Sequence, residues 1–342
     1  MKVKTFFLEL SLLAIAGMWT GCSKDDEVVV NAFNDQQPIS FRVQGGMPTL
    51  RSTGTTVPFV NAFVVFGNTN DQPIGTNIFN GTTIARQPGG GNNFDYNPKK
   101  YYSATAANAE FAAYSPVSTK ISAPSFVFGI GSGSGSGFSF NYEVAVPDAT
   151  GNTTQEDLLV AGTPVVVSTT PTPVQLSFQH ALSRIFVKAT NTLSETIIIK
   201  SLKLKNLYST GKITGTPGAS WSWNWSDFGS KKDYDYVLAP TGVAVKAKLS
   251  SPTLVTSMEQ GMMVLPQDVG NSSKDPTLFA LEVNFDLSNI NNTEYIYIPN
   301  VYAFEMGKQY AVTINFSGFP SLIVIDFTID VTPFFEPIVD AP

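Results

Sequence analysis

Apolar residues recur along this chain in short continuous runs and in alternation with polar residues. Both patterns indicate β-strands, because successive side chains of a strand point to opposite faces. Helical i, i+3, i+4 spacing is hardly present, and clusters of Gly, Pro, Asn, Asp and Ser separate the runs. The strands predicted on this basis cover residues 39–43, 62–66, 111–114, 158–161, 165–167, 197–207, 295–298 and 310–316.

The cleanest alternation lies near the end of the chain, in residues 323–331. One face of this predicted strand is apolar, and the other carries Asp326, Thr328 and Asp330. Regularly spaced short strands with frequent turns favour β-sandwiches over alternating strands and helices. We therefore predict an all-β protein. The apolar face of the late strand consists of Ile323, Ile325, Phe327, Ile329 and Val331.

A polar segment with two prolines, residues 168–173, is the best candidate for a linker between domains. It divides the chain into residues 39–168 and 174–342, each of ordinary domain size. Residues 22–38 are mostly polar and are predicted to be a tether.

The first 21 residues have the pattern of an export signal. Lys2 and Lys4 precede an apolar stretch that is too short to cross a membrane. Small residues lead up to Cys22, which stands where a bacterial lipoprotein carries its lipid, and two acyl chains give stable anchoring. We predict a signal peptide over 1–21 and lipid attachment at Cys22. The alternative is a free thiol that is removed with a longer signal peptide.

The amino-acid composition excludes several kinds of functional site. The chain has 342 residues with one cysteine and one histidine, so an internal disulfide and a Cys/His zinc finger are excluded. The net charge is −6 and no Lys/Arg cluster occurs, which argues against nucleic acid as a partner. No phosphate-binding loop, zinc-protease helix or serine-hydrolase elbow is present, and we predict no cofactor, no metal and no catalytic residue. Two carboxylates would suffice for glycoside hydrolysis, but no pair stands out.

His180 is the one histidine through which a catalytic triad would have to run. It shares the apolar face of a predicted strand with Val174, Leu176 and Phe178. This position favours a hydrogen-bonded structural histidine over a catalytic base. Beyond Arg184 the apolar phase changes, which predicts a bend near Ser183.

Two further features allow a binding or a structural interpretation. Trp221, Trp223 and Trp225 fall on one face of an extended segment, where they would stack on a sugar or on another subunit, or pack inside the protein. We favour packing, and an exposed row would reverse that judgement. Asp233 and Asp235 alternate with tyrosines, as on a solvated strand edge.

Arg51 lies in a Gly/Thr-rich stretch between the first two predicted strands. Small and polar neighbours predict a loop that a trypsin-like protease can reach.

Several motifs resemble the fimbrillin family of type V pilus subunits and their surface-lipoprotein relatives. The strongest is the run Leu176 to Arg184, LSFQHALSR, which is close to the family strand L-x-F-x-H-x-L-[AS]-[KR]. Supporting matches are residues 156–161 (EDLLVA), 111–116 (FAAYSP), 263–267 (MVLPQ) and 306–310 (MGKQY), together with the lipoprotein start.

The resemblance implies two transthyretin-like β-sandwich domains in tandem, exported as a lipoprotein precursor. In members of the family that polymerise, an arginine-specific protease cuts after the first strand, that strand leaves, and a neighbouring subunit donates a strand to the open groove. Carried over to this chain, residues 39–43 would leave, the cut would follow Arg51, and the donor would be residues 323–331 with Phe334 and Phe335.

The leading hypothesis is thus a structural or adhesive fimbrial subunit without enzymatic activity. Its partners would be other subunits through strand addition, the cell outer membrane through the lipid, and a host protein or glycan. The alternative is a surface-anchored glycan-binding lipoprotein, or a fimbrial anchor or tip protein, that is not polymerised. An all-β glycan hydrolase has the least support.

Overall fold

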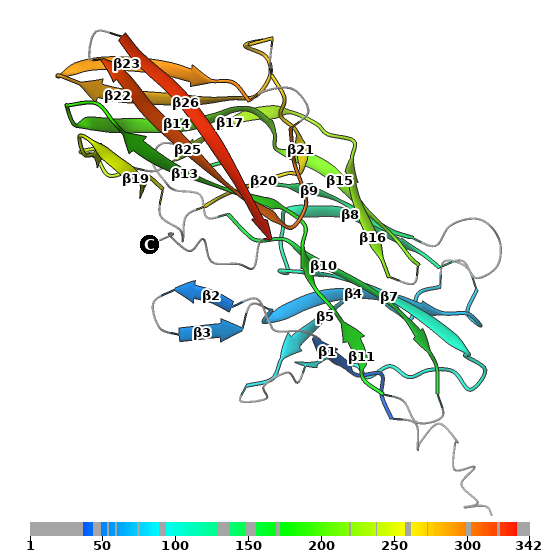
Figure 1. Ribbon diagram of the computed structural model, residues 1–342. Helices are drawn as coiled ribbons and strands as arrows, with labels where there is room; N and C mark the ends of the chain where they lie inside the picture. Colours follow the sequence, from blue (N-terminus) through cyan, green and yellow to red (C-terminus); the bar gives the residue numbers. More distant parts are fainter. Residues whose placement is uncertain are drawn as a thin grey trace, which may run out of the picture.

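The computed structural model describes residues 37–43, 49–52, 55–58, 60–73, 76–88, 94–128, 137–147, 155–168, 172–218, 220–236, 238–256, 261–271, 273–298, 302–319 and 322–333. Within these ranges the secondary structure consists of strands, turns and bends, without a helix. The all-β prediction is confirmed. Figure 1 shows an elongated molecule with one lobe that contains β1, β4, β5, β7, β10 and β11 and a second lobe that contains β13, β14, β22, β25 and β26.

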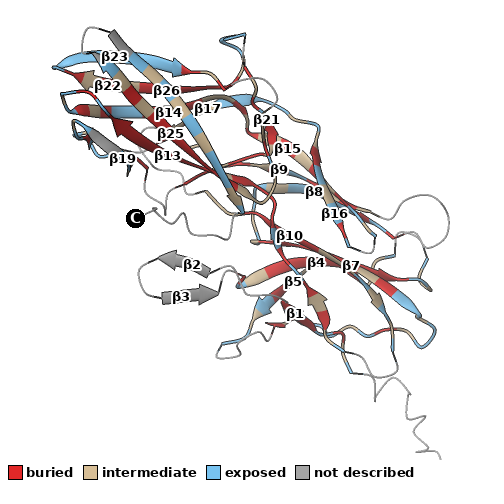
Figure 2. Ribbon diagram, in the orientation of Figure 1, coloured by how far each residue is buried: buried red, intermediate tan, exposed pale blue. Residues whose placement is uncertain are grey.

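A six-stranded sheet forms the centre of the first lobe, and its middle strands are buried on both faces (Figure 2). Seven of the eight residues of β4 are buried, which explains why residues 62–66 read as a continuous apolar run instead of an alternation. The strand order is β12 (Gln179–His180), β10 (Leu159–Val166), β7 (Asn108–Ser115), β4 (Ala62–Thr69), β5 (Phe79–Arg86) and β6 (Phe94–Asp95).

Each face of this sheet contributes to a different hydrophobic core. One face packs with a small parallel sheet of β1 (Phe41–Val43) and β11 (Val174–Leu176). The other face packs with a four-stranded sheet in the order β16 (Ser222–Ser226), β15 (Thr210–Thr216), β9 (Gly137–Glu143) and β8 (Ile121–Val127).

The second lobe is a sandwich of two sheets that continues the second of these cores. One sheet contains β19 (Leu249–Leu254), β13 (Ser183–Asn191), β25 (Lys308–Phe319) and β26 (Leu322–Pro333), with β20 (Met262–Val264) paired to β13. The other contains β17 (Lys231–Tyr236), β14 (Ile197–Tyr208), β22 (Ala280–Leu287) and β23 (Ile290–Ile296), with β18 (Val243–Val245) paired to β14. Two short pairs remain: β2 (Thr49–Ser52) with β3 (Thr55–Pro58), and β21 (Gln267–Asp268) with β24 (Ala303–Phe304).

The division predicted at residues 168–173 does not separate two independent sets of strands. β11 and β12 follow this segment in sequence, yet they pair with β1 and β10 of the first lobe. β15 and β16 also lie beyond it, and β15 pairs with β9. The proline-containing segment therefore connects two strands of one lobe, and the chain crosses to the second lobe between β12 and β13.

Candidate functional site: strand β1 and its groove

β1 fills a groove in the first lobe through three alternating side chains. Ile39, Phe41 and Val43 are buried, whereas Ser40 and Arg42 point to solvent. The ring of Phe41 has centroid distances of 5.3 Å to Phe79 and 5.5 Å to Phe111. Phe63 and Tyr96 complete the aromatic wall at 6.0 and 6.1 Å. We call the space enclosed by these four rings and β11 the β1 groove.

Few backbone bonds hold β1 in this groove. Its ladder with β11 pairs Phe41 with Val174, Arg42 with Gln175 and Val43 with Leu176. The N–H of Ile39 donates to the carbonyl of Lys100 at 2.9 Å, and the N–H of Val174 donates to the carbonyl of Ser40 at 2.8 Å.

A buried tyrosine of the groove wall also binds the backbone next to β1. The hydroxyl of Tyr96 donates to the carbonyl of Ile39 at 2.6 Å. Burial raises the pKa of Tyr96 to about 12, so the hydroxyl keeps its proton for this bond at physiological pH. The Nζ of Lys100 lies 4.9 Å from the centroid of Phe79, where desolvation lowers its pKa.

The geometry suits exchange of one strand for another. Burying each apolar side chain of β1 contributes about 1.5–3 kcal/mol, and an empty groove would expose four aromatic rings to water. The same groove provides main-chain partners that are independent of the sequence of the strand it holds. Another strand with the same alternation would therefore satisfy it.

Arg51 lies in β2 of a two-stranded hairpin, where its register partner is Thr56. The stretch predicted as a loop is thus paired in the structure. The hairpin joins no other described strand, and an isolated two-stranded hairpin is marginally stable in water. It connects β1 to β4, so a cut after Arg51 would leave β1 held by noncovalent contacts alone.

The late alternating strand is β26, an edge strand whose described partner is β25. Half-buried and exposed residues alternate along this strand and appear in Figure 2 as tan and pale blue segments. Ile325, Phe327 and Ile329 pack partly against the core, while Val331 is 45% exposed. Phe334 and Phe335 lie outside the described residues, as do Cys22 and the tether up to residue 36.

His180 belongs to a buried polar cluster between the lobes. Its Nδ1 lies 2.6 Å from Oδ2 of Asp157. Burial raises the pKa of Asp157, which the hydrogen bond to His180 and the charge of Arg184 oppose. The guanidinium of Arg184 covers the ring of Phe186 at 4.6 Å. Asp157, His180 and Arg184 all lie in the motifs quoted above, but nothing in the sequence showed that their side chains meet.

This cluster supports the structural interpretation of His180. The side chains of His180 and Asp157 are 2% and 8% exposed, so a substrate has no access to them. The neighbouring hydroxyl of Ser183 donates to the carbonyl of Glu305 instead of to the imidazole. The bend predicted near Ser183 is confirmed: β12 ends at His180, the chain bends at Leu182, and β13 begins at Ser183.

The tryptophan row is part of the core, and the alternative of an exposed stacking platform is wrong. Trp221 and Trp225 are each 7% exposed, and Trp223 is partly buried. The indole N–H of Trp225 donates to the carbonyl of Ala181 at 2.8 Å. Glycines make room for the other two rings, since a Cβ at Gly162 would lie 2.2 Å from Trp221 and one at Gly215 would lie 2.5 Å from Trp223.

Asp233 and Asp235 lie on a charged sheet face, as predicted for a solvated strand. Lys205 Nζ is 3.1 Å from Oδ2 of Asp233, and Lys203 Nζ is 3.4 Å from Oδ1 of Asp235. These lysines come from the neighbouring strand β14, so the pairs are cross-strand contacts.

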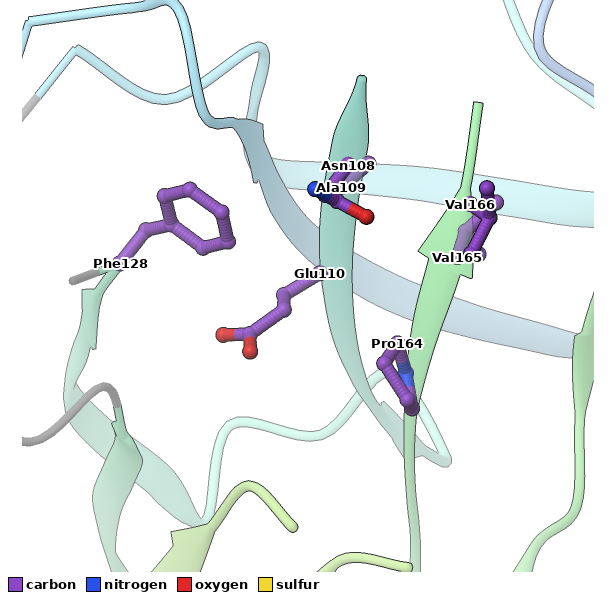
Figure 3. A pocket seen from close by; sticks show the side chains of 7 residues that line it. All are labelled: Asn108, Ala109, Glu110, Phe128, Pro164, Val165 and Val166. Carbon is purple, nitrogen blue, oxygen red and sulfur yellow. The ribbon is translucent and has the colours of Figure 1, made fainter. Parts of the chain in front are cut away.

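A small pocket of about 270 Å³ opens at the end of the first lobe (Figure 3). Phe128 lies on one side of it, the side chain of Glu110 points from β7 towards that side, and Pro164, Val165 and Val166 come from the neighbouring strand β10. No predicted site residue lines it. Among the described residues no group of His, Cys, Asp or Glu side chains is arranged to hold a metal, and no helix is long and apolar enough to cross a membrane.

Comparison with known proteins identifies relatives of the whole arrangement. A family model described as fimbrillin-like matches residues 51–331. A fimbrial protein of Bacteroides vulgatus has 15% sequence identity and a TM-score of 0.57, over 87% of this chain and 99% of that chain. A candidate cell adhesion protein of Bacteroides ovatus has 15% identity and a TM-score of 0.51, over 87% and 98% of the two chains. No curated protein matches the sequence.

Proposed function

The chain belongs to the fimbrillin-like family, and we propose on this premise that it is a fimbrial subunit assembled by protease-triggered strand exchange. The family is one of fimbrial proteins, which act at or beyond the cell surface. The observation that carries the proposal is β1, a buried strand with one described ladder, followed directly by the hairpin that contains Arg51.

The proposed cycle has three steps. The precursor is exported and anchored through lipid on Cys22, and β1 fills the groove during folding. An arginine-specific protease then cuts after Arg51, so that β1 leaves with the anchor. A second copy of the chain finally inserts a strand from its C-terminal region into the groove, and main-chain hydrogen bonds supply affinity that is independent of sequence.

The risk of aggregation at an open groove explains why β1 would be kept in place until the cut. A subunit with an empty groove would aggregate with any exposed strand, so the precursor keeps β1 in place until export is complete. The short ladder with β11 allows β1 to leave once its covalent connection is broken.

Treatment of the purified precursor with an arginine-specific protease tests this function. We expect a new N-terminus at Ser52 and a ladder of polymers on gels. The matched control, Arg51→Ala, should remain uncut and monomeric under the same conditions. A clean cut at Ser52 without polymers would contradict assembly by strand exchange.

Anchoring is tested separately in cells. A Cys22→Ala variant is expected to lose its association with membranes after a carbonate wash. A variant that stays in the membrane fraction would contradict lipid attachment at Cys22.

A further inference from the structure

The outer face of the sheet that contains β23 carries two tyrosines that the proposed function does not use. Tyr295 in β23 and Tyr297 directly after it have ring centroids 6.5 Å apart and an angle of 29° between the ring planes. Tyr295 is 45% exposed and Tyr297 is half-buried. Ile296, which lies between them in sequence, is buried in the core on the other side of the sheet. The tyrosine rings therefore remain at the surface of the second lobe.

β23 gives this surface a regular, open edge. Its ladder with β22 runs through seven consecutive residue pairs without a shift, and β22 is its described partner. Thr293 and Asn291 continue the row of outward side chains that starts at the tyrosines, and both are exposed; Figure 2 shows the strand in pale blue. From Asn291 to Tyr297 the row spans about 20 Å, because each strand residue advances about 3.4 Å. The row is long enough for an extended ligand.

The charged side chains on the neighbouring strands of this face are paired with one another. Four ion pairs join β14 to β17 and β22 at distances between 3.1 and 3.4 Å: Lys200–Asp286, Lys203–Asp235, Lys205–Asp233 and Lys205–Glu282. The three lysines and four carboxylates leave one negative charge in excess. A strongly charged partner therefore finds no complementary patch on this face.

Neutral polar groups beside the tyrosines are available to a ligand. The Nδ2 of Asn291 donates to Oδ1 of Asn284 at 2.6 Å and to Oδ1 of Asp286 at 3.2 Å. The Oδ1 of Asn291 and the Nδ2 of Asn284 then have no partner among the described residues. The hydroxyls of Thr293 and Tyr295 also bond to no residue in the described part of the chain. Amides and hydroxyls together can both donate and accept hydrogen bonds, as sugar hydroxyls do.

We propose that Tyr295, Tyr297 and the row of polar side chains along β23 form a binding site for a neutral oligosaccharide. The C–H face of a sugar ring stacks on an aromatic ring, and tyrosine combines such an apolar face with a polar hydroxyl. The sugar hydroxyls bond to the amide and hydroxyl groups of the row. A nucleic acid would require a basic surface, and a stable protein interface would require a larger apolar centre than two tyrosines provide.

This site is a function in addition to assembly. It lies in the second lobe, whereas the β1 groove lies in the first (Figure 1). It also differs from the tryptophan row, whose rings belong to the core. A polymer of this chain would present one such site per copy, and simultaneous binding of several sites raises the overall avidity.

Titration of the uncut chain with neutral oligosaccharides tests the site without any need for strand exchange. The probes are hexasaccharides built from glucose, mannose, galactose or xylose, and binding is measured by isothermal titration calorimetry. We expect at least one of them to bind and Tyr295→Ala to weaken this binding at least about tenfold. Tyr295→Phe keeps the ring and loses one exposed hydroxyl, so its affinity should stay within about threefold of the parent.

The matched control is Tyr101→Ala. Tyr101 lies in the first lobe and is 44% exposed, nearly as much as Tyr295. Its replacement removes the same amount of side chain from another part of the surface, so the variant should bind the hexasaccharide as the parent chain does. Circular dichroism of each variant verifies that the fold is retained.

Several results would overturn the inference. Absence of binding to all four hexasaccharides does so, as does an equal loss of affinity in Tyr101→Ala and Tyr295→Ala. Binding of heparin in place of the neutral probes would show that charge is recognised instead of the tyrosines. Self-association of the uncut chain that Tyr295→Ala abolishes, measured by analytical ultracentrifugation, would assign the face to a second copy. None of these results bears on strand exchange, which the cut at Arg51 tests separately.

Discussion

Phe41 makes ring contacts with all four aromatic residues of the filled groove. Replacing it with alanine removes a ring surrounded by four aromatic residues and leaves a cavity, a change that costs about 3–5 kcal/mol in comparable cores. We expect Phe41→Ala to lower the free energy of unfolding of the uncut precursor by at least about 3 kcal/mol, measured by urea denaturation with circular dichroism.

The neighbouring Arg42 provides the control for this prediction. It lies on the same strand but points to solvent, so Arg42→Ala should change the free energy of unfolding by less than about 0.5 kcal/mol. Equal effects of the two substitutions would contradict the placement of Phe41 in the groove.

Asp71 makes part of the stability of the first lobe sensitive to acid. Desolvation alone would raise its pKa, but hydrogen bonds from Ser103, Thr105 and Thr69 lower it from 3.8 to about 2. Because the carboxylate is favoured in the folded state, this contribution is present above pH 4 and is lost as the pH falls towards 2.

An Asp71→Asn variant should therefore show a weaker dependence of stability on pH between 4 and 2 than the parent chain does. Thermal denaturation at a series of pH values measures this. Thr105→Val, which removes one donor at 2.6 Å, should give an intermediate dependence. An unchanged pH profile in Asp71→Asn would show that other carboxyl groups determine it.

Residues for which both a structural and a functional role were possible were the hardest to assign from the sequence. The alternation around His180 correctly predicted a buried side chain, but its contact with Asp157 depends on the pairing of β10 with β12. The sequence favoured packing of the tryptophans without showing which residues make room for them, because their burial depends on Gly162 of β10 and Gly215 of β15. Side chains that fit against residues of another strand leave no periodic pattern in the sequence of their own strand.

At the scale of elements, the proposed function makes β1 a removable ligand of the groove. A peptide with the sequence of residues 37–43 should therefore bind the chain cut at Arg51 and stop polymer growth. The same peptide with Phe41→Ala should inhibit at least about tenfold more weakly, because a loss of 1.4 kcal/mol already corresponds to that factor. The measurement is the peptide concentration that halves the polymer ladder.

A peptide with Arg42→Ala is the matched control and should inhibit as the parent peptide does, since this side chain faces solvent. Equal inhibition by all three peptides would show that the ring contacts of Phe41 in the β1 groove do not select the strand.

Elements with strong hydrophobic patterns were predictable, and the others were not. β4 and β26 were found because one is buried on both faces and the other alternates along an edge. β15 was missed: its sequence TGKITGT is dominated by small and polar residues that give space to the tryptophans of β16. Its strand structure comes from pairing with β9 and β16, which local sequence does not encode.

At the scale of the whole molecule, the two halves of the sequence are interlocked. One hydrophobic core extends from the second lobe through the four-stranded sheet to the central sheet of the first lobe. β15 and β16 carry the chain back from the second lobe and extend the sheet of β8 and β9, with β15 paired to β9. The sequence suggested two separate domains because its strongest loop signal, residues 168–173, lies between two strands that belong to the same lobe.

This continuity predicts that the chain unfolds as one cooperative unit. A fragment that ends at residue 173 lacks β11, β12, β15 and β16, so its central sheet would keep only β1 on one face and only β8 and β9 on the other. We expect this fragment to bind a hydrophobic dye and to show no fixed tertiary structure by near-ultraviolet circular dichroism. The full chain should show a single calorimetric transition whose calorimetric and van't Hoff enthalpies agree. A folded fragment, or two well-separated transitions in the full chain, would mean that the shared core contributes little and that the lobes are independent.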